Sequence, residues 1–259
     1  MMERTKIYTA LKGVRGQDTV DMAALEQLLV RFSELVVEQP AIAELDINPL
    51  LASPERLMAL DARVILHPQE VADGDLPKPA IRPYPRKYVQ PWKTEGGIDF
   101  VIRPIRPEDE SLVVDFHGRL SNETVYQRYF TKLGYEQRVA HERLVRVCFT
   151  DYDREVALVA ERLDPETDKL CIAGIARLIR LHNSRTAEFS LIVADDYQGH
   201  GLGTEMVRRL IEVGRQEGLH RMVAEILGAN GGMVRICEEL GFSITADEDG
   251  DTLQAELQL

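Results

Sequence analysis

One run of the sequence restricts the fold more than any other: DYQGHGLGTEM, residues 196–206, in which every second position from Gly199 to Gly203 is glycine. The residues before it, 186–196, are rich in β-branched and aromatic side chains and predict a buried strand. The residues after it carry apolar side chains at helical spacing as far as Gly218, which favours a helix end. The sequence therefore predicts a strand that turns through bare backbone into a helix.

A strand-to-helix turn of this kind predicts an anion-binding site. The first N–H groups of a helix lack partners within the helix and lie at the positive end of its dipole. Glycine lets a phosphate approach these groups without meeting side chains. A P-loop is excluded because Gly203 is followed by Thr204 and not by lysine. The dinucleotide fingerprint is disfavoured because the spacing is Gly-x-Gly-x-Gly and not Gly-x-Gly-x-x-Gly.

The spacing of Gln198, Gly201 and Gly203 fits the pattern Gln/Arg-x-x-Gly-x-Gly/Ala. This pattern resembles the pyrophosphate loop of the GNAT acyltransferases, the general-control-related N-acetyltransferase superfamily. The resemblance implies that the loop binds acyl-CoA and that the preceding strand bonds the pantetheine arm through its backbone, where an amide would also polarise the thioester carbonyl. The alternative is a glycine-rich turn without a ligand. The implied cofactor-binding residues are Leu191, Ile192, Val193, Gln198, Gly199, His200, Gly201, Leu202, Gly203 and Thr204.

The order of predicted elements from residue 98 to residue 259 also resembles a GNAT domain. A strand, helices, three strands, the glycine loop with its helix, a strand, a short helix and a final hairpin follow one another, with turns predicted at DPETDK, LHNSRT and DEDGD. We therefore expect an α/β (α+β) domain with a mixed, mostly antiparallel sheet flanked by helices. Asn230, which begins NGGMVRICEELGF, resembles a second cofactor-binding position, although Asn-Gly-Gly is also an ordinary turn.

The first third of the chain differs in character. Asp21 is placed to cap a helix with one apolar stripe, which Pro40 ends, and two strand-like runs follow. Six of the 12 prolines lie between Pro68 and Pro91, as in an extended linker. We expect a small α/β segment over residues 1–70, a linker over 71–97 and the GNAT domain over 98–259.

Two runs in the small segment, ELDINPLLA and ALDARV, resemble the end of the ATP-grasp domain in ADP-forming acyl-CoA synthetases. That resemblance would make Asn48 and Asp61 ligands of Mg²⁺. However, about 70 residues cannot contain the nucleotide-binding lysine, the glycine-rich lid and both lobes of such a domain. We therefore interpret residues 1–70 as a C-terminal fragment whose acidic residues belong to a structural hairpin, and we expect no metal site.

A synthetase segment joined to a GNAT domain resembles the Pat-type bacterial protein lysine acetyltransferases. The runs AIRPYPRKY, IRPIRPEDE, LSNETVYQRYF and DYDREVALVAE fit the same resemblance. It implies transfer of an acetyl group from acetyl-CoA to the ε-amine of a lysine on a protein, by direct attack in a ternary complex, with an acyl-CoA synthetase as the suspected acceptor. Two alternatives remain: a GNAT enzyme that acetylates a small amine, and a weakly active binding or regulatory module.

The chemistry requires a base, because a lysine amine with a pKa of about 10.4 is protonated at neutral pH and cannot attack a thioester. Glu188 lies on the strand before the glycine loop and resembles the strand glutamate that GNAT protein acetyltransferases use as base. Partial burial would raise the pKa of Glu188 toward the working pH and make it a better base. The alternative is a salt-bridged strand residue, and Glu123 and Glu155 are then the next candidates.

Cys237 occupies the place where many GNAT enzymes carry a tyrosine that protonates the departing CoA sulfur. Met233, Cys237 and Leu240 share one helical face, which favours a buried core position over an acid role. A thiolate is a good leaving group, so the reaction needs no dedicated acid.

The 259 residues carry a formal charge of −12, which disfavours a nucleic-acid or anionic-membrane surface. Cys148, Cys171 and Cys237 are scattered without metal-ligand spacing and are typical of a reducing compartment. No apolar run approaches membrane-spanning length. We expect a cytoplasmic protein whose partners are a CoA thioester and a protein acceptor, with no nucleic acid or membrane.

Overall fold

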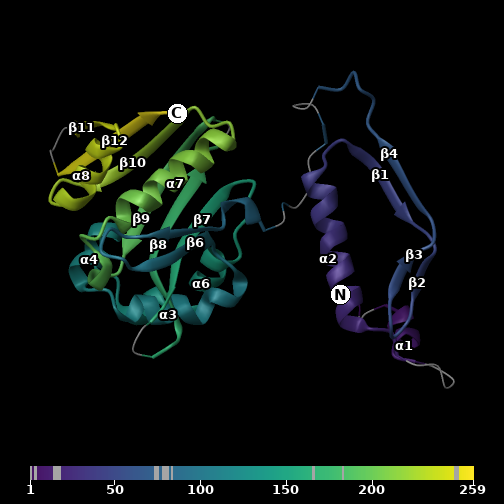
Figure 1. Cartoon of the computed structure of the whole chain (residues 1–259). Coiled ribbons are helices and arrows are strands. Elements are labelled where there is room, and N and C mark those ends of the chain that lie inside the picture. Colours follow the sequence, from purple (N-terminus) through teal and green to yellow (C-terminus); the bar gives the residue numbers. More distant parts are fainter. Residues whose placement is uncertain are drawn as a thin grey trace. The chain divides into compact units, whose positions relative to one another are not determined.

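A computed structural model describes residues 2, 5–13, 19–72, 76–77, 82, 84–164, 167–182, 184–247 and 251–259. The chain divides into two units, Met1–Pro83 and Tyr84–Leu259 (Figure 1). Several sequence predictions fall partly outside the described residues: much of the proline-rich segment, at 73–75, 78–81 and 83, and the tips of the three predicted turns, at 165–166, 183 and 248–250.

The described residues of the first unit form two α-helices and two antiparallel pairs of strands. Asp21 caps the longer helix, because its Oδ1 accepts a hydrogen bond of 2.9 Å from the backbone N–H of Ala24. Leu25 is the one buried residue among those described in this unit. The elements are α1 (Ile7–Leu11), α2 (Met22–Glu38), the antiparallel pair β1 (Ile42–Ile47) with β4 (Ala62–Leu66), and the antiparallel pair β2 (Leu50–Ala52) with β3 (Leu57–Ala59).

The second unit is built on an eight-stranded sheet of described residues in the order β11-β12-β10-β9-β8-β7-β6-β5. Its neighbouring strands are antiparallel except for β9 and β10, which are parallel. The mixed, mostly antiparallel sheet predicted from the sequence is therefore confirmed. Its strands are β5 (Gln90–Lys93), β6 (Asp99–Pro104), β7 (Glu155–Leu163), β8 (Leu170–Arg180), β9 (Thr186–Val193), β10 (Arg221–Leu227), β11 (Ser243–Ala246) and β12 (Thr252–Gln258).

Strand β5 lies within the segment that the sequence assigned to the linker. It pairs with β6, where Trp92 is opposite Phe100 and the two ring centres are 5.9 Å apart. Pro91 is compatible with this strand because β5 is at the edge of the sheet, where a missing N–H breaks no ladder. The predicted linker is therefore too long at its C-terminal end, and residues 84–97 belong to the second unit.

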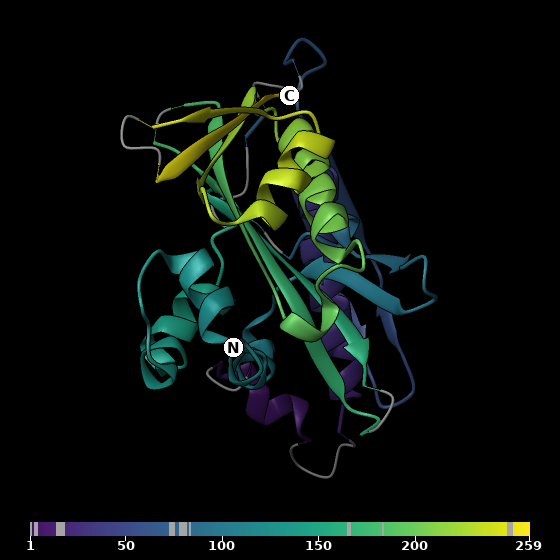
Figure 2. The same cartoon turned by 90° about the vertical axis from the view of Figure 1, so that its left-hand side faces the viewer.

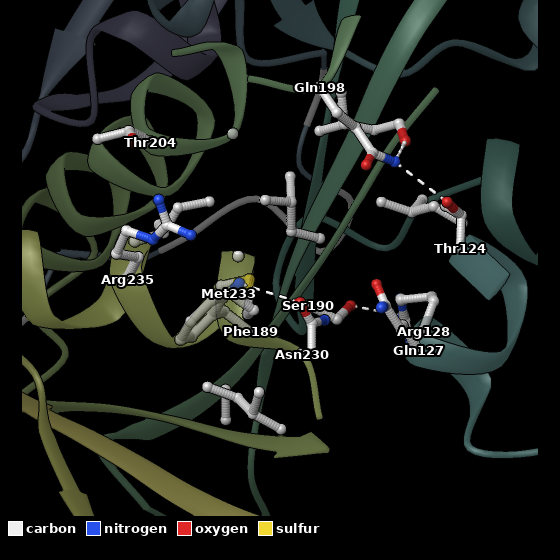
Figure 3. A pocket seen from close by; sticks show the side chains of 18 of the residues that line it. Thr124, Gln127, Arg128, Phe189, Ser190, Gln198, Thr204, Asn230, Met233 and Arg235 are labelled. Atoms are coloured by element: carbon white, nitrogen blue, oxygen red, sulfur yellow. Dashed lines mark hydrogen bonds between the residues drawn. The ribbon is translucent and has the colours of Figure 1, made fainter. Parts of the chain in front are cut away.

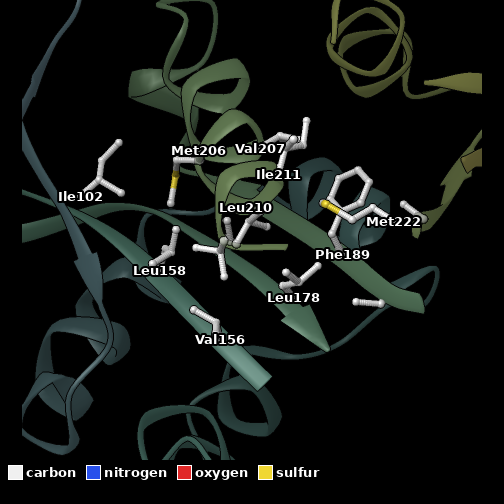
Figure 4. Packing of buried hydrophobic residues seen from close by; sticks show 14 of the residues in the cluster. Ile102, Val156, Leu158, Leu178, Phe189, Met206, Val207, Leu210, Ile211 and Met222 are labelled. Carbon is white, nitrogen blue, oxygen red and sulfur yellow. The ribbon is translucent and has the colours of Figure 1, made fainter. Parts of the chain in front are cut away.

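Helices cover both faces of this sheet (Figures 1 and 2). On one face α7 buries Met206 and Leu210 against strand residues such as Leu158 (Figure 4). Gly174 on β8 permits this close packing, since a Cβ there would lie 2.8 Å from the Met206 sulfur. The helices are α3 (Glu110–Gly118), α4 (Asn122–Tyr129), α5 (Tyr135–Arg138) and α6 (His141–Cys148) on one face, α7 (Leu202–Gln216) and α8 (Gly231–Glu239) on the other, with short 3₁₀ turns η3 (Arg86–Tyr88), η4 (Pro107–Asp109) and η5 (Asp195–Tyr197).

The run IRPIRPEDE has a structural role. Arg103 on β6 is 3% exposed and donates two hydrogen bonds to the Asp109 carboxylate, of 2.7 and 2.8 Å. Its Nε donates to Glu161 on β7 at 3.0 Å, and Asp109 also accepts from the backbone N–H of Arg106 at 2.7 Å. This buried cluster joins β6, η4 and β7, so the run IRPIRPEDE stabilises the fold.

Candidate active site

The site opens where two parallel strands separate. β9 and β10 pair only through Thr186, Ala187 and Glu188, although β9 continues to Val193. Beyond Glu188 a cavity of about 700 Å³ lies between them (Figure 3). Its wall is formed by residues of α4, β9, the glycine loop, β10 and α8. The β10-facing edge of β9 at Leu191, Ile192 and Val193 therefore has no strand partner and leaves its backbone open to the cavity.

The glycine loop presents free amide groups at one end of the cavity. None of the hydrogen bonds among the described residues uses a backbone N–H of residues 199–204 as donor. Gly199 and Gly201 have φ of 76° and 80°, values that favour glycine. Gly203 permits close packing, because a Cβ there would lie 2.9 Å from Ile236 and 3.3 Å from Leu191. These amides at the start of α7 fit the phosphate groups of a CoA molecule.

Gln198 makes hydrogen bonds within the protein through its side chain. Its side-chain Nε2 donates hydrogen bonds to the Val193 carbonyl at 3.0 Å and to Thr124 Oγ1 at 3.1 Å (Figure 3). The amide nitrogen thus holds the loop against β9 and α4, and Gln198 also lines the cavity. Of the other loop side chains, His200 bonds the Gln198 carbonyl at 2.8 Å, and Thr204 donates a long bond of 3.4 Å to Glu239.

Asp195 ties the same loop to the start of α4. Its carboxylate accepts hydrogen bonds from the Ser121 N–H at 2.9 Å, the Ser121 hydroxyl at 2.6 Å and the Thr124 hydroxyl at 2.9 Å. Partial burial opposes ionisation, yet these bonds hold the pKa of Asp195 below its ordinary value. Ser121 also caps α4 by accepting from the Thr124 N–H at 3.2 Å. The cofactor end and α4 are therefore joined by one hydrogen-bonded network.

Glu188 lines the cavity at the point where β10 leaves β9. Its side chain is exposed, so the partial burial expected from the sequence is absent. Glu188 still pairs with Val223 of β10 and Ile179 of β8, so its exposure reflects a sheet face left uncovered at this position and not an open strand edge. The other candidates lie outside the cavity wall: Glu155 is paired with Arg177 at 2.6 Å, and Glu123 accepts a long bond from Gln127. Among the three acids considered from the sequence, Glu188 alone faces the cavity.

Cys237 lies on the buried face of α8, in the core, and is not part of the cavity wall. Burial, with a smaller effect of Glu238, raises the pKa of its thiol to about 12. The core position predicted from the helical spacing is confirmed. Asn230 caps α8, since its Oδ1 accepts from the Met233 N–H at 3.0 Å, and it also lines the cavity.

Two arginines in the cavity wall, Arg128 on α4 and Arg235 on α8, escaped the sequence analysis. Arg128 donates a hydrogen bond of 2.6 Å to the Ser190 hydroxyl on β9 (Figure 3). One signal for it was present: Arg128 follows Thr124 by four residues, so both lie on the same face of α4.

Two protein families match different parts of the chain. The sequence model of the acetyltransferase (GNAT) domain family matches residues 99–243, and that of an ATP-grasp domain family matches residues 1–66. The chain belongs to the GNAT acetyltransferase family. Members of this family are N-acetyltransferases that use acetyl-CoA, and the N-terminal ATP-grasp resemblance is likewise confirmed.

Relatives match different parts of the chain. The acetyltransferase PA5475 of Pseudomonas aeruginosa is 34% identical over 158 residues, 61% of this chain and 82% of that protein. The acetyltransferase Pat of Mycolicibacterium smegmatis is 29% identical over 170 residues, 65% of this chain, which spans about half (48%) of Pat. The β subunit of an ADP-forming acetate–CoA ligase I of Pyrococcus furiosus is 42% identical over 66 residues, 26% of this chain and 28% of the subunit.

The fold has a solved counterpart in the GNAT domain of the PAT protein of S. lividans. That crystal structure is similar with a TM-score of 0.61 and 23% identity, over 68% of this chain and all of that domain. Within the described part of the chain, no helix is both long and apolar enough to span a bilayer, and no three His, Cys, Asp or Glu side chains are grouped to hold a metal ion.

Proposed function

We propose that this GNAT protein transfers the acetyl group of acetyl-CoA to the ε-amine of a lysine on a protein, by direct attack in a ternary complex. The observation that carries the proposal is the position of Glu188, in the cavity wall at the opposite end of β9 from the free amides of residues 199–204. The 29% identity to Pat supports a protein acceptor. The synthetase-like residues 1–66 favour an acyl-CoA synthetase as that acceptor.

The two ends of the cavity suit the two ends of the cofactor. Acetyl-CoA supplies an acetyl thioester that an amine can attack. The amides of residues 199–204 bind its phosphates, and the unpaired edge of β9 bonds the arm between. From Glu188 to Val193 this edge is about 17 Å long at the rise of a β-strand. The thioester therefore lies near Glu188 while the phosphates lie at the start of α7.

Different groups around the thioester then remove the proton and stabilise the developing charge. The carboxylate of Glu188 accepts a proton from the lysine ammonium, directly or through one water. A backbone N–H on the free edge of β9 donates to the thioester carbonyl and stabilises the charge that develops there. The CoA thiolate departs without a side-chain acid from Cys237, which lies outside the cavity wall. Docking of a protein acceptor covers the exposed Glu188 and excludes water from the reaction.

The test uses radiolabelled acetyl-CoA with a purified acyl-CoA synthetase and, separately, a mixture of small amines. We expect label in the synthetase, and mass spectrometry should place it on lysine side chains. The Glu188→Gln variant is the control for non-enzymatic acetylation. Label that enters only small amines would replace the protein acceptor with a small-molecule acceptor, and label in neither would favour a binding module. We also propose a cytoplasmic location, which the three free cysteines support.

A further inference from the structure

Arg128 is a cation in the wall of the cavity that forms no ion pair with a carboxylate among the described residues. Its Nη2 donates to Ser190 Oγ at 2.6 Å, and its side chain is half-buried. No ion pair among the described residues includes Arg128, and the Ser190 bond uses only one of its five N–H donors. A partly buried guanidinium with unused donors is suited to binding an anion.

The position of Arg128 places that anion on the acceptor side. α4 runs along β9, so that Thr124 contacts Gln198 at the loop end while Arg128 contacts Ser190. Glu188 and Ser190 point to the same face of the strand, because they are two residues apart, and their Cα atoms are separated by about 7 Å. Arg128 therefore lies beside the proposed base and away from the phosphate-binding amides.

The surroundings of Arg128 are positively charged although the whole chain carries −12. The guanidinium carbons of Arg128 and Arg143 lie 5.0 and 4.9 Å from the centre of the Tyr129 ring. No described ion pair includes Arg143 either. Burial lowers the pKa of Arg128, and repulsion by Arg177 and Arg143 adds to this effect, while Tyr129 and Glu188 oppose it. An incoming carboxylate would relieve the repulsion.

We propose that Arg128 binds a carboxylate of the acceptor, so that the enzyme prefers a lysine with Asp or Glu two residues before or after it. This inference rests on the proposed function, since it needs a peptide chain as acceptor. The spacing follows from geometry: side chains two residues apart on an extended chain share a face and are separated by about 7 Å. That separation equals the one between Glu188 and Ser190 on β9. A carboxylate at such a spacing reaches Arg128 while the lysine amine reaches Glu188.

The experiment measures kcat/KM for pairs of lysine peptides that differ only by Glu or Gln at one position. Four pairs place this residue two before, one before, one after or two after the lysine. We expect the unaltered protein to prefer Glu over Gln by about tenfold in the pair two before or the pair two after the lysine, the scale of one charge-assisted contact. The two pairs next to the lysine should show no such preference, because adjacent side chains point to opposite faces of an extended chain. Arg128→Gln should reduce this ratio to below about two, and Arg128→Lys should retain part of it.

Two controls separate recognition from folding and from cavity charge in general. Arg235→Gln removes the other arginine of the cavity wall and should leave the Glu-to-Gln ratio unchanged. The affinity of the two Arg128 variants for acetyl-CoA, measured by calorimetry, should stay within about twofold, since Arg128 lies away from the phosphate end. A disrupted fold would lower this affinity as well as both peptide rates.

Two further outcomes distinguish a wrong inference about Arg128 from a wrong proposed function. If the peptides are acetylated without preference, or if Arg128→Gln keeps the preference, Arg128 does not bind an acceptor carboxylate and the inference is wrong, while the proposed function survives. If free α-amino acids are acetylated but no peptide or protein is, the proposed function itself is wrong. The inference that Arg128 binds a side-chain carboxylate of a protein acceptor is then wrong as well.

Discussion

The two units of this chain both match known family models but are built very differently. The second unit buries two large clusters of apolar side chains, one on each face of its sheet. Among the described residues of the first unit only Leu25 is buried, and large apolar side chains such as Val30 and Leu66 are more than half exposed. Family resemblance over residues 1–66 therefore does not imply a self-sufficient domain, because a stable fold requires buried apolar area.

The strongest test of this contrast is whether the chemistry is confined to the second unit. Glu188→Gln keeps the size of the side chain but cannot accept the proton, so kcat should fall by about 10² to 10⁴-fold. The affinity for acetyl-CoA should be nearly unchanged, because only the transition state loses an interaction. Higher pH should restore part of the rate, since more of the acceptor lysine is then neutral.

The matched change in the first unit is Asp61→Asn, which removes the acid considered as a metal ligand. Its kcat should remain within about twofold of the unaltered protein, because Asp61 is exposed and does not belong to the unit that holds the cavity. A Glu188→Gln variant that keeps more than about a third of its turnover would show that the proton leaves by another route.

A second test compares an ion pair in each unit. Arg103→Met leaves Asp109 without its cation in a site where both side chains are at most 5% exposed. Loss of one partner of a buried pair should lower the free energy of unfolding by about 3 to 5 kcal/mol. Arg63→Met breaks the pair with Glu44, whose side chains are 67% and 62% exposed, and should cost at most about 0.5 kcal/mol. Equal losses in urea unfolding would contradict the contrast.

A third test uses acid, because the first unit has no buried titratable side chain among its described residues. In the second unit His117 is buried on α3, and burial followed by repulsion from Arg138 and Arg143 lowers its pKa to about 4. Since the folded-state pKa lies below the ordinary value of 6.5, the stabilisation is complete above pH 6.5 and is lost as the pH falls toward 4. The total loss is about 3 kcal/mol.

The measurement is denaturant unfolding of the second unit between pH 7 and pH 4, followed by the fluorescence of Trp92. His117→Phe should flatten the pH dependence over this range, because the titrating group is gone. An identical slope in the variant would assign the acid sensitivity to other groups.

The smallest expected effect concerns ligand binding. Gly201 has φ of 80°, so Gly201→Val strains the loop and covers its amides, and the affinity for acetyl-CoA should fall by about 1 to 3 kcal/mol. Gly218 has φ of 67° outside the cavity wall, so Gly218→Val supplies the same strain without touching the site. Calorimetry should show normal affinity for acetyl-CoA in Gly218→Val and reduced affinity in Gly201→Val.

ATP in place of acetyl-CoA extends this titration to the first unit. We expect no saturable binding, since about 70 residues cannot hold an ATP-grasp site. Micromolar binding of ATP would contradict our interpretation of residues 1–70, and unchanged acetyl-CoA affinity in Gly201→Val would contradict the phosphate site.

Features determined by neighbouring residues could be predicted from the sequence. The glycine loop and the cap at Asp21 are local, and Cys237 followed from helical spacing. Contacts between residues distant in the sequence were not predicted. Gln198 bonds Thr124, 74 residues away, and Arg128 bonds Ser190, 62 residues away. The exposure of Glu188 depends on which elements cover its face of the sheet, which no local pattern encodes.

The hydrogen-bonded network between the glycine loop and α4 has a consequence for protein engineering. A graft that exchanges α4 in order to change the acceptor would also remove Ser121 and Thr124, which Asp195 and Gln198 require as partners. The graft would then disturb cofactor binding even if the new helix fitted its new acceptor perfectly. Ser121, Thr124, Asp195 and Gln198 therefore act as one structural unit. A redesign that transplants all four together should retain the cofactor affinity of the parent enzyme.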